Sequence, residues 1–152
     1  VLLPVGGRVT KVTQTPTITA GTYAAKEALG GLLTFASAAR VSGGSIVIEA
    51  VTVIDKAQQM AALELVLFDQ TFTATTDNNP FDPSDADLAN CIGVIPITTW
   101  FDFNDNSVAH RSGLGLAATL SGTSLFGQLV IRSAATYAAT TDIVVIVHIA
   151  QN

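Results

Sequence analysis

The fold class is decided by the stretch Ser45-Ile-Val-Ile-Glu-Ala-Val-Thr-Val-Ile-Asp55. Its β-branched residues favour a strand. Strict alternation gives that strand two largely apolar faces, one with Ile46, Ile48, Ala50 and Ile54 and the other with Val47, Glu49, Val51 and Val53. A strand that is apolar on both faces lies between two layers, and in an antiparallel domain the second layer is often a neighbouring subunit. The stretch therefore predicts a sandwich that also contacts another chain.

Further apolar and β-branched runs lie on both sides of this strand, at residues 32–36, 62–69, 91–98, 125–133 and 143–150. Gly, Asn, Asp and Ser residues separate these runs at short intervals, a pattern typical of sandwiches and barrels. About eight strands with one long connection fit a jelly roll. The sequence therefore predicts a single all-β domain at residues 20–152, an antiparallel, jelly-roll-like β-sandwich.

Three of the runs also indicate which side chains face the core. In residues 62–69 and 125–133 the inward side chains are expected to be Leu63, Leu65, Leu67, Leu125, Leu129 and Ile131. Residues 143–150 alternate between Val145, Val147 and Ile149 on one face and Val144, Ile146 and His148 on the other. This last run repeats the two-faced pattern of residues 45–55.

Residues 1–19 are expected to form an extended N-terminal arm or an edge strand. Pro4 and Pro16 oppose a central strand, because proline has no N–H to donate to a ladder. The Thr-rich alternation between them favours an extended arm that adds to a neighbour's sheet edge. The alternative is that these residues form the first edge strand of the same domain.

The long connection at residues 70–90 carries the best helix signal and a set of acids. Ser84 can cap a short helix at residues 85–90. Carboxylates that could bind calcium recur here, namely Asp69, Asp77, Asp82, Asp85 and Asp87. Their spacing does not match an EF-hand, and capping with solvation accounts for them. We predict no metal site, with a structural calcium ion as the open alternative.

The charge balance excludes one class of partner and favours another. The chain has 7 Lys and Arg residues and a net charge of −5, whereas nucleic-acid binding needs clustered basic side chains. Charged residues make up 12% of the chain, against about a quarter in ordinary soluble domains. A weakly charged, partly apolar surface favours protein contacts. We expect protein partners, including copies of the chain itself, and no nucleic acid.

Neither disulfide bonding nor membrane insertion is expected. Cys91 is the only cysteine, so it has no partner for an intramolecular disulfide. The longest apolar stretch, residues 143–150, is much shorter than the about 20 residues of a membrane-spanning helix. Residues 1–5 lack the basic flank of a signal peptide. The sequence is typical of a protein made inside the cell that does not enter a membrane.

One glycine pattern suggests a dinucleotide site but lacks the required context. Gly113 and Gly115 match a relaxed form of the motif in which glycines let a pyrophosphate approach a helix. A helix that began there would meet Gly122 within two turns, and no parallel βαβ unit surrounds it. We interpret the segment as a tight connection between strands and predict no cofactor.

A few residues have the types needed for catalysis or metal binding. His110, Ser112 and Asp105 could make a triad, but the strained turn that holds such a serine is missing, and Ser124 misses the elbow spacing by one residue. We predict no catalytic residue and no enzymatic activity. His148 is expected to be an interior or interface residue, because two histidines far apart in sequence and one cysteine make a poor ligand set.

The candidate interface combines the two-faced strands, the N-terminal segment and an aromatic cluster. Alternation in Trp100-Phe101-Asp102-Phe103 separates Trp100 from the two phenylalanines, so the three rings cannot all enter one small core. Trp100 either anchors an interface or covers the end of the sandwich. The predicted interface residues are Leu2, Leu3, Val12, Ile18, Val47, Val51, Val53, Trp100, Phe101, Phe103 and His148.

Several segments resemble small structural proteins of tailed bacteriophages and prophages, which include capsid decoration (cement) proteins. The similar segments are Ala20-Gly-Thr-Tyr23, Ala50-Val-Thr-Val-Ile-Asp55, Ala62-Leu-Glu-Leu-Val-Leu-Phe-Asp69, Pro80-Phe-Asp-Pro-Ser-Asp-Ala-Asp-Leu88 and Thr141-Asp-Ile-Val-Val145. The resemblance extends over most of the chain and brings no catalytic motif with it. It implies a jelly-roll-like or other β-sandwich protein that forms a homotrimer, lies on the capsid and clamps adjacent capsomers.

The resemblance implies a place on the capsid surface of a virion, with synthesis in the cytoplasm of the bacterial host. The partners that it implies are other copies of the chain and the phage major capsid protein. A tail, neck or fibre component of the same particle is the main alternative. A cellular β-sandwich esterase or glycan-binding module is the third.

Overall fold

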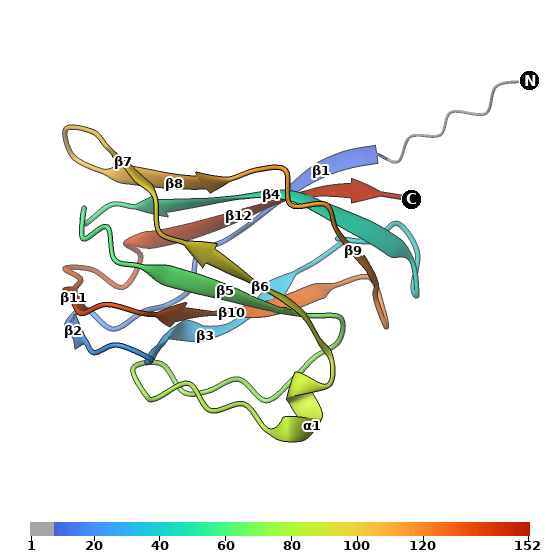
Figure 1. The fold of residues 1–152 in the computed structure, drawn as a ribbon, viewed down its shortest axis with the longest axis horizontal. Helices are drawn as coiled ribbons and strands as arrows, with labels where there is room; N and C mark the ends of the chain where they lie inside the picture. Colours follow the sequence, from blue (N-terminus) through green and yellow to red (C-terminus); the bar gives the residue numbers. More distant parts are fainter. Residues whose placement is uncertain (1–7) are drawn as a thin grey trace, which may run out of the picture.

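A computed structural model describes residues 8–152 as two main antiparallel β-sheets packed face to face, with a two-stranded sheet of β2 and β11 at one end and an irregular segment beside the smaller main sheet (Figure 1). The principal strands are β1 (Arg8–Gln14), β3 (Ala28–Phe35), β4 (Ser45–Asp55), β5 (Leu63–Phe68), β6 (Cys91–Ile97), β8 (Ser107–Arg111), β10 (Leu125–Ile131) and β12 (Ile143–Gln151). Shorter elements are β2 (Thr22–Tyr23), β7 (Trp100–Asp102), β9 (Leu116–Thr119), β11 (Ala135–Thr136) and the helical turn α1 (Asp85–Leu88).

The strand order is that of a jelly roll. The large sheet has the order β1-β12-β4-β8-β7, with β9 also paired to β4, and the small sheet has the order β3-β10-β5-β6. The antiparallel pairs β5·β6, β4·β8, β3·β10 and β1·β12 enclose one another along the chain, as in a long hairpin rolled into two layers. A double-sheet arrangement of this kind is a jelly roll. The predicted all-β, antiparallel, jelly-roll-like sandwich is confirmed.

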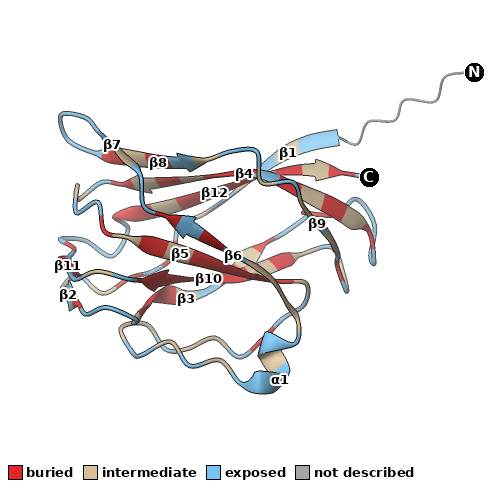
Figure 2. Ribbon diagram, in the orientation of Figure 1, coloured by how far each residue is buried: buried red, intermediate tan, exposed pale blue. Residues whose placement is uncertain are grey.

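The core lies between the two sheets and follows the predicted alternation in most strands. Buried and partly exposed residues alternate along β12, with Val145, Val147 and Ile149 inside, and the inward residues predicted for β5 and β10 are all buried (Figure 2). Burial of each such side chain contributes about 1.5–3 kcal/mol. The hydrophobic pattern therefore accounts for both the layers and the register.

Strand β4 departs from strict alternation because it contains a bulge. His148 pairs with Ala50 and Ile149 pairs with Ile48, which leaves Glu49 as an extra residue on β4. Because of this one extra residue, each side chain of β4 after the bulge points to the opposite face of the sheet from the one that strict alternation predicts. The prediction that Val51 and Val53 belong to an interface was therefore wrong, since they are 1% and 0% exposed in the core.

The N-terminal strand β1 pairs with β12 along its whole length and forms the edge of the large sheet. Residues 8–14 therefore take the edge-strand alternative rather than the free arm. Val12 lies opposite Val147 and packs against the core. Ile18 is 2% exposed, so its assignment to an interface was wrong. Leu2 and Leu3 lie outside the described residues.

The segment at residues 70–84 covers the outer face of the small sheet. Phe72 stacks on Phe68 with ring centroids 3.9 Å apart, and both belong to a second apolar cluster that includes Val66 and Val130. Gln128, which is fully buried, bonds this segment through both the N–H and the carbonyl of Thr75. The small sheet therefore has the core on one face and this segment over part of the other face, where Val94 of β6 is 50% exposed.

Gly30 lies inside β3, which begins at Ala28 rather than at residue 32, where the predicted run begins. Its φ is +80°, and a Cβ there would lie 2.5 Å from Cβ of Pro16. Its carbonyl accepts a hydrogen bond from Gln128, across a register irregularity between β3 and β10. Only glycine fits this position without strain.

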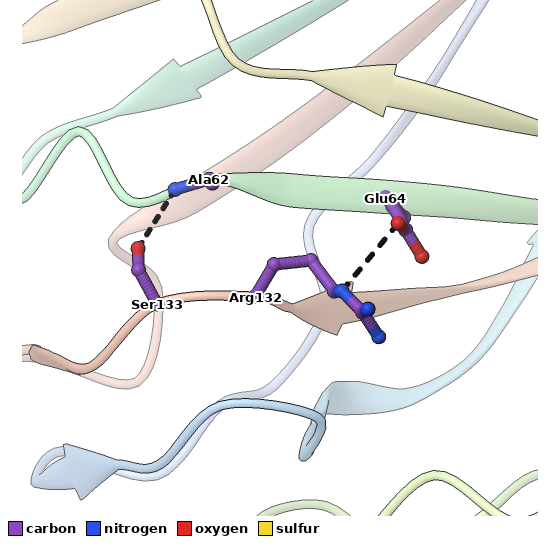
Figure 3. Close-up of polar contacts among 4 residues, drawn as sticks. All are labelled: Ala62, Glu64, Arg132 and Ser133. Carbon is purple, nitrogen blue, oxygen red and sulfur yellow. Dashed lines mark hydrogen bonds and ion pairs between the residues drawn. The ribbon is translucent and has the colours of Figure 1, made fainter.

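Polar contacts join the start of β5 to the residues just after β10 (Figure 3). The Ala62 N–H donates to Ser133 Oγ at 3.0 Å, and Arg132 Nε lies 3.4 Å from Glu64 Oε1. Both charged side chains are partly exposed, so the ion pair contributes at most about 1 kcal/mol. These contacts secure one end of the small sheet and do not form a functional site.

Candidate protein interface

The candidate interface is the face of the large sheet that points away from the core, here called the outer face. Residues directly opposite each other in an antiparallel ladder share a face, so the register defines its members. They are Val9, Lys11 and Thr13 of β1, Val144, Ile146, His148 and Ala150 of β12, Val47, Ala50, Thr52 and Ile54 of β4, Val108 and His110 of β8, Phe101 of β7 and Ala117 of β9.

The outer face is mostly apolar and open to solvent. Val9 is 71% exposed and Phe101 is 57% exposed, while Val144, Ile146 and Ile54 are half-buried by their sheet neighbours. Figure 2 shows the partly exposed residues of β4 and β12 alternating with buried ones. An apolar face of this kind is unfavourable in water and favourable against a protein partner.

The two sheets differ in what covers their outer sides. Residues 70–84 lie over the small sheet, whereas among residues 8–152 no segment packs over the outer face of the large sheet. The described residues thus cover much of one apolar surface themselves and leave the other available. This asymmetry is the main reason for assigning the interface to the large sheet.

The predicted interface residues divide between this face and the rest of the molecule. Val47, Phe101 and His148 lie on the outer face. Trp100 faces the other way, packs against the core and donates from its indole Nε1 to the carbonyl of Ala61 at 3.0 Å. It therefore covers the end of the sandwich. Phe103 is 58% exposed, beside the turn that joins β7 to β8.

Two histidines that are distant in sequence meet on the outer face. The hydroxyl of Thr52 lies 2.8 Å from His110 Nδ1 and 3.2 Å from His148 Nε2, and the ring centroids are 5.9 Å apart at an interplanar angle of 87°. Burial lowers the pKa of His148, with smaller contributions from the nearby charges of His110 and Lys11. The sequence offered no sign of this pair, because only the strand order places β8 and β12 on either side of β4.

The surroundings of His148 should make the free energy of unfolding of this chain depend on pH. The pKa of His148 is lower in the folded chain than its ordinary value of 6.5, so the unfolded chain binds more protons as the pH falls through this range. The free energy of unfolding should therefore decrease from pH 7 to pH 5.5, and less so in a His148→Gln variant. Urea unfolding at both pH values measures this difference. Equal decreases in the two proteins would contradict the assignment.

The residues weighed for catalysis and cofactor binding have other surroundings. His110 bonds Thr52 through Nδ1, and Asp105 lies in the exposed turn between β7 and β8. Gly113 and Gly115 have φ values of +66° and +56° in the connection from β8 to β9. That connection leads into β9, which pairs with β4, so the two glycines allow the chain to turn tightly between two strands that both pair with β4.

The acids of residues 69–87 do not converge on one point. Asp77 accepts three hydrogen bonds, from Tyr23, Gly30 and Thr19. The Ser84 side chain accepts from the N–H of Asp87 and caps α1, which ends at Leu88 rather than Asn90. Among residues 8–152 no group of three or more His, Cys, Asp or Glu side chains is arranged to hold a metal ion.

A helix that spans a membrane must be long and apolar. Within residues 8–152 no helix is long and apolar enough to span a bilayer, and α1 has 4 residues.

Comparison with solved structures returns viral proteins. A chain of the capsid of Ralstonia phage GP4 has a TM-score of 0.44 and 17% identity, over 99% of this chain and 89% of that chain. A chain of Desmodium yellow mottle tymovirus has a TM-score of 0.31 and 12% identity, over 99% and 86%. A chain of infectious bursal disease virus, strain Gx, has a TM-score of 0.33 and 13% identity, over 98% and 41%. No protein-family model and no curated protein matches the sequence. The fold assignment rests on the strand order and ladders.

Proposed function

We propose that this chain is a structural protein of a virus particle, and specifically a capsid decoration protein of a tailed phage. The observation that carries the proposal is the outer face, an apolar surface of the large sheet that the described chain leaves uncovered. We assign a second copy of the chain as its occupant, in a homotrimer that sits on the major capsid protein.

The architecture supports a role in assembly. Double-sheet jelly rolls form viral capsid domains as well as lectins and cupins, so the fold alone does not choose among them. The outer face favours assembly, because Val144, Ile146 and Ile54 offer an apolar area without a polar, concave site. The resemblance of several sequence segments to phage structural proteins supports the same choice.

Charge supports contact between copies. The titratable side chains on the outer face are Lys11, His110, His148 and, at the bulge of β4, Glu49, whereas Asp82 and Asp85 lie exposed near α1, on the side of the small sheet. In a cyclic trimer each contact joins two different surfaces of neighbouring copies. A largely apolar surface that carries Lys11 can therefore meet a surface that carries Asp82 and Asp85 on the next copy.

The proposed mechanism is mechanical. A standard protein interface buries about 1,600 Å² in total. Repetition over a symmetric shell multiplies a modest affinity at each site, as in other multivalent assemblies. The protein would thus hold neighbouring capsomers together without chemical change.

Copy number in purified particles tests this proposal. A decoration protein covers the shell, so mass spectrometry with labelled standards should find this chain at a number comparable with that of the major capsid protein. A tail, neck or fibre component would be present in far fewer copies. A particle with only a few copies of the chain would contradict the decoration role.

A further inference from the structure

We propose that His110 and His148 form a binding site for one divalent transition-metal ion on the outer face. The inference goes beyond the proposed function. The site lies on the same outer face, where the neighbouring copy of the proposed homotrimer would fill the remaining ligand positions in place of water, and a separate measurement tests it. It starts from the convergence of two imidazole nitrogens on the single hydroxyl of Thr52.

The sheet brings the two ligands together. His110 on β8 and His148 on β12 both lie opposite residues of β4, which runs between them. Nδ1 of His110 and Nε2 of His148 lie 2.8 and 3.2 Å from Thr52 Oγ1. Because the strands are part of one ladder, this arrangement is held by the backbone. Two preplaced nitrogen ligands lose little conformational entropy when an ion binds.

The protonation states are compatible with a metal ion. A threonine hydroxyl has one proton, so it donates to one ring and accepts an N–H from the other. A metal ion needs the lone pairs of both nitrogens. The ring that now donates can move its proton to its other nitrogen, and the structure gives neither His110 Nε2 nor His148 Nδ1 a hydrogen-bond partner within residues 8–152.

Bond lengths and donor type restrict the ion. Imidazole nitrogens bind zinc at about 2.0–2.1 Å, so the two rings must close around the ion while the Thr52 hydroxyl rotates away. Water would fill the other positions in a single copy of the chain. Imidazole suits zinc, copper and nickel, whereas magnesium and calcium prefer oxygen. Lys11 lies opposite His148 on β1, and Glu49 lies at the bulge of β4; the lysine opposes a cation and the carboxylate favours it.

Isothermal titration calorimetry, in which zinc chloride is added to the full chain at pH 7.5, tests the site. We expect one ion per chain, and affinity at least tenfold weaker in both His110→Gln and His148→Gln. Cys91→Ser is the matched control and should bind as the unchanged chain does, because Cys91 lies on the small sheet. Circular dichroism melting verifies that each variant is folded.

Competition with protons gives a second readout. Because both ligands must be deprotonated, the affinity should fall at least tenfold between pH 7.5 and pH 5.5. Copper should bind more tightly than zinc. Absence of binding at millimolar zinc, or binding that survives both glutamine variants, would overturn the site. Neither result would affect the proposed function, which copy number tests separately.

Discussion

An Asp77→Ala variant is expected to lose about 3–5 kcal/mol of unfolding free energy. Oδ1 of Asp77 accepts from the Tyr23 hydroxyl and the Gly30 N–H, both at 2.6 Å, and Oδ2 accepts from Thr19 Oγ1 at 2.7 Å. Alanine would leave these donors without their partner. Tyr23 is fully buried, so water cannot readily replace the bond.

The three donors show why this carboxylate matters to the whole fold. Thr19 follows the edge strand β1, Tyr23 is in β2, and Gly30 is in β3 at the position where only glycine fits. Asp77 therefore joins the covering segment of residues 70–84 to the first third of the chain. Burial raises the pKa of Tyr23, and its hydrogen bond to Asp77 raises it further.

Urea unfolding measures the loss, with two comparison variants. Asp77→Asn retains one acceptor oxygen and should lose an intermediate amount. Asp82→Ala removes an exposed acid from the same segment and should change stability by no more than about 0.5 kcal/mol. A loss below about 1 kcal/mol for Asp77→Ala would show that these bonds do not organise the segment.

The same substitution at two adjacent positions on β12 should lower the free energy of unfolding by very different amounts. Val147 is fully buried, so Val147→Asp places an unpaired charge in the core and should cost at least about 4 kcal/mol. Ile146 lies on the outer face, so Ile146→Asp should cost about 1 kcal/mol or less in the isolated chain.

If Val147→Asp does not fold, Val147→Ala keeps the comparison measurable. Removal of its two methyl groups should cost about 2 kcal/mol. Denaturant midpoints of Ile146→Asp and Val147→Ala, measured at a protein concentration low enough that the unchanged chain is monomeric, then show which site contributes more to folding. A larger loss at Ile146 than at Val147 would contradict the assigned faces of the large sheet.

The sequence predicted the strands better than the faces. Apolar runs located β4, β5, β10 and β12 closely, because each run is bounded by turn residues and buries one full face. The bulge at Glu49 has no local signal, since it depends on the partner strand. One unseen extra residue was enough to misplace Val51 and Val53.

The candidate site was predictable only in part. The two-faced pattern of residues 143–150 identified the outer face, and Phe101 followed from alternation with Trp100. Ile18 looked like part of an arm, although the chain bends it into the core after β1 ends. The His110 and His148 pair could not be foreseen, because 37 intervening residues separate two histidines that only the jelly-roll strand order brings together.

Molar mass in solution tests most directly the claim that the outer face is a contact between copies. Size-exclusion chromatography with light scattering, at tens of micromolar, should give about three times the chain mass of 15.7 kDa for the unchanged protein. Ile146→Asp should give the monomer mass with an unchanged circular dichroism spectrum. A monomeric unchanged protein, or an Ile146→Asp variant that assembles equally well, would contradict the account.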